Sequence, residues 1–243
     1  MHLLEQLPGI IWAGFMGLVI GNFTTSPIYR LPRSEPLFTR DPFCDSCHAP
    51  LKPRDLFPVL SWLMNRGLCR YCKARIPSAY TVTEAFVCLL FILCYLHFGF
   101  SELFLLVALG MTSFVMIAMM LKLDNFFSDR TLIAGIVLGM LYRTLIDGTI
   151  YGFAGAGFAG LMAGVILWKL SKRPLVRNIS EYPSYVKLLV AAGVWLPLIQ
   201  LPGVLLAMGI ASLLAKDKKW LMEFSIMACV MIETLYSHLM VSL

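Results

Sequence analysis

The sequence predicts an all-α polytopic membrane protein with about eight transmembrane helices and a small cytoplasmic zinc-ribbon-like module between the first two. Two observations lead to this fold class. Of the 243 residues, 59% are hydrophobic and only 14% are charged, with a mean hydropathy of +0.78, which excludes an ordinary soluble globular protein. In addition, the one sizeable polar segment carries two Cys-x-x-Cys pairs.

The first 28 residues predict the first transmembrane helix. An apolar segment runs from Pro8 to Ile28 and is long enough to cross a bilayer. The residues before it lack the basic region of a signal peptide, and no small-residue cleavage site follows it. We therefore expect residues 1–28 to form a retained helix rather than a signal peptide.

Residues 29–79 form the polar segment, with nine Lys or Arg residues against four Asp or Glu residues. Within it, Cys44-Asp45-Ser46-Cys47 is followed, after twenty-one residues, by Cys69-Arg70-Tyr71-Cys72. Two such pairs can place four thiolates around one metal ion, which is the ligand set of a structural zinc ribbon. The predicted metal ligands are Cys44, Cys47, Cys69 and Cys72.

The chemistry of these thiols also predicts the side of the membrane on which they lie. Thiolates persist as metal ligands in a reducing compartment, whereas elsewhere four clustered cysteines tend to pair. We therefore expect residues 29–79 to be cytoplasmic. The alternatives are two disulfides or four unliganded thiols. Because four thiolates leave no open coordination position, the predicted zinc is structural rather than catalytic.

Residues 80–243 predict a seven-helix membrane domain. Its apolar stretches are, in chain order, about 80–99, 102–121, 131–146, 149–170, 186–199, 201–215 and 220–242. Lys and Arg residues gather in alternate connectors, which under the positive-inside rule places both termini outside the cytoplasm and the cysteine module inside. The formal net charge of +6 is thus a topology signal, and we expect lipid but no nucleic acid as a partner.

Residues 20–86 contain a series of recognisable motifs. They are Gly21-Asn22-Phe23-Thr24-Thr25-Ser26-Pro27-Ile28-Tyr29-Arg30-Leu31-Pro32, Pro58-Val59-Leu60-Ser61-Trp62-Leu63, Arg66-Gly67-Leu68-Cys69-Arg70-Tyr71-Cys72, and Ile76-Pro77-Ser78-Ala79-Tyr80 followed by Glu84. Together with the cysteine pairs, they resemble the motifs of the bacterial type IV prepilin leader peptidase/N-methyltransferase family. Thr25 stands where the first motif has asparagine.

The resemblance implies a multi-pass protein of the bacterial inner membrane. Members of that family remove the leader peptides of type IV prepilins or type II secretion pseudopilins, and they N-methylate the cleaved product with S-adenosylmethionine. The resemblance associates methyl transfer with the cysteine module at residues 29–79, and it implies prepilins, pseudopilins and pilus or secretion assembly proteins as partners.

The resemblance also implies aspartic endopeptidase chemistry of the GxGD type, in which two carboxylates share a proton and activate water. Phe127-Ser128-Asp129 is similar to the end of the first aspartate motif, and the expected aspartate eight positions earlier falls on Leu121. The run from Val186 resembles the sequence after GxGD, so the second aspartate falls on Tyr185. The sequence therefore predicts a pseudoenzyme that has lost proteolysis.

Three alternatives stay open. Asp124 lies one helical turn after Leu121, and Glu181 lies four residues before Tyr185, so these two carboxylates could form a displaced catalytic dyad. The contrary interpretation is that Asp124, Asp129 and Glu181 are solvated charges at the membrane surface. N-methyltransferase activity could also persist without proteolysis. Finally, the chain could be a zinc-stabilised membrane assembly protein unrelated to pilins.

Overall fold

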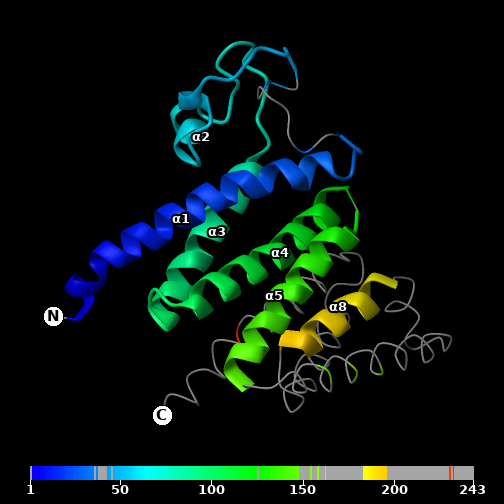
Figure 1. Cartoon of the computed structure of the whole chain (residues 1–243). Coiled ribbons are helices and arrows are strands. Elements are labelled where there is room, and N and C mark those ends of the chain that lie inside the picture. Colours follow the sequence, from blue (N-terminus) through cyan, green and yellow to red (C-terminus); the bar gives the residue numbers. More distant parts are fainter. Residues whose placement is uncertain are drawn as a thin grey trace, which may run out of the picture. The chain divides into compact units, whose positions relative to one another are not determined.

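The computed structural model describes residues 2–35, 37, 43–44, 46–124, 126–147, 154, 158, 162, 183–195, 230 and 232 (Figure 1). The described residues fall into two compact units, Met1–Phe100 and Ser101–Leu243. Their regular structure is helical apart from two isolated β-bridges. Glu181 and most of the predicted spans at 149–170, 201–215 and 220–242 lie outside the described residues.

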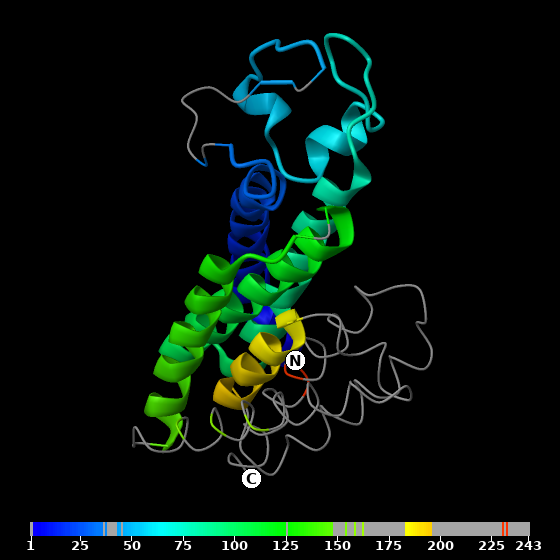
Figure 2. The ribbon, with the colours of Figure 1, turned by 90° about the vertical axis from the view of Figure 1, so that its right-hand side faces the viewer.

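The first unit is built on two long helices, α1 (His2–Arg30) and α3 (Ser78–Phe98). They run antiparallel, since Gly9 of α1 lies beside Tyr95 of α3 and Gly21 lies beside Glu84. A Cβ atom on Gly21 would lie 2.9 Å from the Glu84 Cα, so glycine here lets the two backbones approach closely. In the chain, the short elements η1 (Pro53–Asp55) and α2 (Leu60–Met64) follow α1 and precede α3. Figure 2 shows residues 46–77 at the first turns of α3.

The second unit contains α4 (Glu102–Asp124), α5 (Asp129–Asp147) and α8 (Pro183–Trp195). Helix α5 begins after Ser128, whose hydroxyl accepts a hydrogen bond from the Thr131 backbone NH at 3.3 Å, as an N-cap does. Helix α8 begins at Pro183, because proline at the first helical position already has a helical φ and loses no hydrogen bond.

Trp195 joins these three helices. Its side chain is 1% exposed, its ring stacks on Tyr142 of α5 at a centroid distance of 5.3 Å, and it meets Phe114 of α4 edge-on at 6.4 Å. Its indole NH donates to the Gly135 carbonyl oxygen at 3.1 Å. A Cβ atom on Gly139 would lie 2.6 Å from the indole nitrogen, so the core of this unit depends on a small residue facing a large one.

Three described helices are long and apolar enough to cross a membrane, namely Glu5–Arg30, Ser78–Phe98 and Glu102–Asp124. They correspond to the first three predicted spans, and the helical membrane-protein class is confirmed to that extent. The total of eight spans stays a prediction. Helix α4 extends three residues beyond the predicted end at residue 121, so Asp124 is its last residue.

Candidate functional site

The four predicted metal ligands lie together in space. The sulfurs of Cys44, Cys47, Cys69 and Cys72 are all within 4.8 Å of one another. Four sulfurs at 2.3 Å from a tetrahedral zinc ion are separated by about 3.8 Å, and the Cys44 and Cys72 sulfurs are 4.0 Å apart. A disulfide would bring two sulfurs to about 2.05 Å. The four cysteines are therefore free thiols, and the group could hold a metal ion such as zinc.

The two Cys-x-x-Cys pairs form loops of the same design. In the first, the Cys44 NH donates to the Ala49 carbonyl oxygen and the His48 NH donates to the Cys44 carbonyl oxygen. In the second, the same two bonds join Cys69 with Ala74 and Lys73 with Cys69. His48 and Lys73, the residues after each second cysteine, both have a left-handed φ, at 56° and 60°.

We call these loops the first and second knuckle. Each is closed at its base by one antiparallel bridge, Phe43 with Pro50 and Leu68 with Arg75. The cysteine spacing predicts a paired ligand set, and the backbone conformation of the loops explains how the paired sulfurs are oriented. Each tight loop turns both of its sulfurs toward one point, so two loops are sufficient for a tetrahedral site.

The protonation of these thiols is coupled. The backbone NH of Cys72 donates to the Cys69 sulfur and, outweighing burial, lowers the pKa of that thiol to about 7. The Ala74 NH acts in the same direction at Cys72, but burial and the neighbouring sulfurs together raise the pKa of Cys72 to about 11. One thiolate therefore opposes ionisation of the next. A divalent cation would remove that opposition by pairing with all four negative charges.

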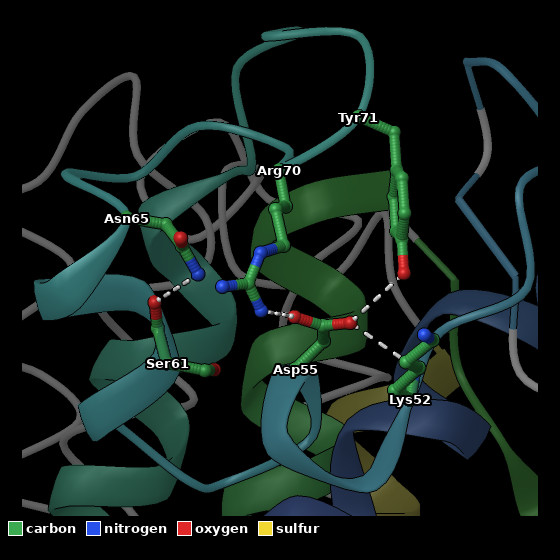
Figure 3. A network of polar contacts seen from close by, with 6 residues as sticks. All are labelled: Lys52, Asp55, Ser61, Asn65, Arg70 and Tyr71. Atoms are coloured by element: carbon green, nitrogen blue, oxygen red, sulfur yellow. Dashed lines mark hydrogen bonds and ion pairs between the residues drawn. The ribbon is translucent and has the colours of Figure 1, made fainter.

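Asp55 supports the second knuckle and was not identified from the sequence. Its carboxylate accepts hydrogen bonds from the Arg70 guanidinium and the Tyr71 hydroxyl, each at 3.4 Å, and from the Lys52 backbone NH at 3.1 Å (Figure 3). Arg70 and Tyr71 are the two residues between Cys69 and Cys72. One available signal is that Asp55 is the single acidic residue within 46–77.

Two further hydrogen bonds tie the residues before α2 to the long helices. The Val59 backbone NH donates to the Glu84 carboxylate at 2.7 Å, and the Asn22 side-chain amide donates to the Leu56 carbonyl oxygen at 3.4 Å. Glu84 is only 7% exposed. The motif residues Asn22, Val59 and Glu84 thus meet in one place, although they are far apart in the sequence.

The protease motifs lie on α4, α5 and α8. Leu121 is half-buried in the last turn of α4, and Asp124 is exposed at its end. Tyr185 lies in the first turn of α8. The Lys187 ammonium group lies 2.5 Å from the Asp129 carboxylate, so the first turn of α5 and the start of α8 are adjacent. The structure thus brings the two motif segments near one another, while Glu181 lies outside the described residues.

Comparison with known proteins gives consistent matches. The family described as the Bacterial Peptidase A24 N-terminal domain matches residues 15–98. The prepilin leader peptidase/N-methyltransferase of Aeromonas hydrophila is 31% identical, over 84% of this chain and 80% of that protein. The protein of the same name from Neisseria gonorrhoeae is 24% identical, over 84% and 79%. No solved structure matches the chain significantly.

Proposed function

The chain belongs to the prepilin leader peptidase/N-methyltransferase family, and from this premise we propose that it binds type IV prepilins or type II secretion pseudopilins in the bacterial inner membrane without cleaving them. One observation carries the proposal. The sequences flanking both expected aspartates are present, but Leu121 and Tyr185 occupy the positions themselves. The binding surface can therefore persist where the proteolytic chemistry is lost.

The two replacements remove the chemistry that an aspartic peptidase needs. A dyad works because two adjacent carboxylates hold one proton between them and exchange it with water. The leucine at 121 has no proton to exchange. Residue 185 is a tyrosine, and a tyrosine hydroxyl, whose reference pKa is about 10, is a poor general base at neutral pH.

We further propose that Cys44, Cys47, Cys69 and Cys72 bind one structural zinc ion on the cytoplasmic side of the membrane. The separations of the sulfurs fit tetrahedral coordination, and the two knuckles orient them. Bound zinc would supply a cross-link between the two knuckles. The Asp55 carboxylate would hold the second knuckle through Arg70 and Tyr71.

N-methyl transfer is a second candidate function, and a specific observation favours it. The family match at residues 15–98 covers the whole cysteine module at residues 29–79, which is the part of the chain that the resemblance associates with methylation. The substrate would be the α-amino group of a pilin cleaved by another peptidase. S-adenosylmethionine would supply the methyl group; the described residues do not by themselves assign its binding site.

Intact-mass analysis distinguishes these functions. A full-length prepilin and a pre-cleaved pilin are each incubated with the purified protein, zinc and S-adenosylmethionine, with an active relative as the positive control. We expect the leader to stay on the prepilin and the prepilin to co-purify with the protein. A methyl group added to the cleaved pilin would establish the second function.

Removal of the leader would contradict the loss of proteolysis and point to the displaced dyad. Asp124 lies in the last turn of α4, one helical turn after Leu121, so that dyad would pair Asp124 with Glu181. In that case Asp124→Asn and Glu181→Gln should each abolish cleavage. Failure of both prepilin and pseudopilin to co-purify would overturn the binding function itself.

A further inference from the structure

The segment 57–64 exposes a set of large apolar side chains. The exposed fractions are 58% for Phe57, 55% for Leu60, 56% for Leu63 and 82% for Met64. Leu60, Leu63 and Met64 are spaced i, i+3 and i+4, so they share one face of α2. Four such side chains within eight residues form a patch rather than scattered exposure.

The opposite side of the segment faces Gly67 and Ile76, which flank the second knuckle. The Trp62 indole NH donates to the Ile76 carbonyl oxygen at 3.3 Å, and a Cβ on Gly67 would lie 2.8 Å from the Trp62 ring. Gly67 has a φ of +70°, which favours glycine, and the missing side chain leaves room for the indole. Trp62 therefore fixes α2 to the residues that flank the second knuckle, while Leu60, Leu63 and Met64 stay exposed.

The segment is held at the first turns of α3, a helix long and apolar enough to cross a membrane. Val59 is hydrogen-bonded to Glu84, which lies six residues into α3, or about 9 Å from its start at 1.5 Å per residue. Helix α3 has 21 residues and is about 31 Å long, which only just spans a hydrocarbon core of about 30 Å. If α3 crosses the bilayer along its whole length, the bond to Glu84 holds Val59 near the boundary between headgroups and acyl chains.

The charge of the module fits an anionic surface at that boundary. Six basic side chains between residues 46 and 77 are exposed: Lys52, Arg54, Arg66, Arg70, Lys73 and Arg75. The one acidic residue of that range, Asp55, has a side chain only 5% exposed and paired with Arg70. The exposed charge of residues 46–77 is thus entirely positive, as in segments that bind anionic lipid headgroups.

We propose that segment 57–64 lies in the bilayer that α1 and α3 span, with its apolar side chains at the acyl boundary and the basic residues of the module against anionic phospholipid headgroups. Depth, amphipathic spacing and charge all favour the lipid as the occupant of this face. The placement depends on neither proteolysis nor methyl transfer, because it follows from the contacts of Val59 and from the length of α3.

Photo-crosslinking tests the placement. The full chain is reconstituted with zinc in nanodiscs of phosphatidylcholine and phosphatidylglycerol that carry an acyl-chain diazirine, irradiated, and mapped by mass spectrometry. We expect lipid adducts on Phe57, Leu60, Leu63 and Met64 at yields similar to Phe23, an exposed residue of the α1 span. Tyr71, which is 43% exposed in the second knuckle, should stay unlabelled.

A variant tests the contribution of the apolar face. The double substitution Leu63→Asp with Met64→Asp should remove the adducts on Phe57 and Leu60 while zinc content and labelling of Phe23 are unchanged. Replacing phosphatidylglycerol by phosphatidylcholine should lower the yield in the segment severalfold. An unchanged yield would overturn the role given to the basic residues.

Two results would overturn the membrane placement. The first is labelling of Phe23 without labelling of the segment in the unsubstituted chain. The second is the loss of the segment's lipid adducts when a prepilin is added, because that would make the apolar face a surface for the substrate. Adducts that persist with prepilin bound would support the lipid as the occupant.

Discussion

The Lys187 ammonium group lies 2.5 Å from the Asp129 carboxylate and joins the start of α8 to the first turn of α5. Both residues belong to segments that resemble the two aspartate motifs. Their side chains are 44% and 62% exposed, so solvent screens the pair. The contact therefore shows that the two segments are adjacent, but it contributes little to the free energy of unfolding.

A double-mutant cycle on this pair should show weak coupling. We expect Asp129→Ala and Lys187→Ala to be coupled by less than about 1 kcal/mol, and the coupling should fall with added salt. Asp129→Ala should cost more than Lys187→Ala, because Asp129 also lies at the positive end of the α5 dipole. Thermal unfolding in detergent measures both effects, and a coupling that is large and insensitive to salt would contradict the screened geometry.

Trp195 should dominate the stability of the second unit. We expect Trp195→Ala to destabilise it by about 3–5 kcal/mol through the cavity left between α4, α5 and α8. Trp195→Phe should cost about 1–3 kcal/mol, because the Gly135 carbonyl oxygen loses its donor. Leu141→Ala, at a side chain 50% exposed on α5, is the control. Equal melting temperatures for the tryptophan variants and the control would be inconsistent with this packing.

Sequence patterns were sufficient for the helical membrane class, the family and the grouping of the four cysteines. The reason is that each depends on local composition or fixed spacing, and those can be identified in one stretch of chain. The end of α4 was misplaced by three residues because Lys122 and Asp124 are polar residues that continue the helix beyond its apolar part.

The contacts between distant residues could not be predicted in the same way. Asp55 with Arg70, Val59 with Glu84 and Trp195 with Gly135 depend on tertiary packing, and no periodicity encodes them. The left-handed φ of His48 and Lys73 could not be predicted either, because histidine and lysine do not indicate a positive φ as glycine would. The expected aspartate positions were assigned to Leu121 and Tyr185 from the flanking motifs alone, and that assignment stays a prediction.

Metal analysis should find one zinc ion per chain, and Cys69→Ser should abolish it. Loss of one thiolate leaves three ligands, with Cys72 alone in the second knuckle, so the tetrahedral set is incomplete. Cys88→Ser, a substitution in α3 outside the cluster, is the matched control and should retain full metal content. If the Cys69 variant keeps its zinc through dialysis against a chelator, the four-sulfur site is wrong.

Asp55→Ala should weaken zinc retention without removing a ligand. Its carboxylate receives two hydrogen bonds from residues of the second knuckle, Arg70 and Tyr71, and one from the Lys52 backbone NH, and their loss should cost the module about 1–3 kcal/mol. The measurement is the rate of zinc transfer to a chromophoric chelator, which should rise. Glu35→Ala removes an exposed carboxylate and serves as the control. Identical transfer rates in the two variants would show that Asp55 does not support the knuckle.

Glu84 should limit the mobility of the residues just before α2. Glu84→Ala would leave the Val59 NH without its acceptor, whereas Glu84→Gln retains a side-chain oxygen that can accept the bond. We expect amide hydrogen exchange around Val59 to accelerate markedly in the alanine variant and only slightly in the glutamine variant. Val59 also has a φ of 57°, which is strained for a β-branched residue, so Val59→Gly should be neutral or stabilising. Equal exchange in the two Glu84 variants would mean that this hydrogen bond does not hold the segment against α3. Strong destabilisation by Val59→Gly would mean that the positive φ of Val59 is not a source of strain.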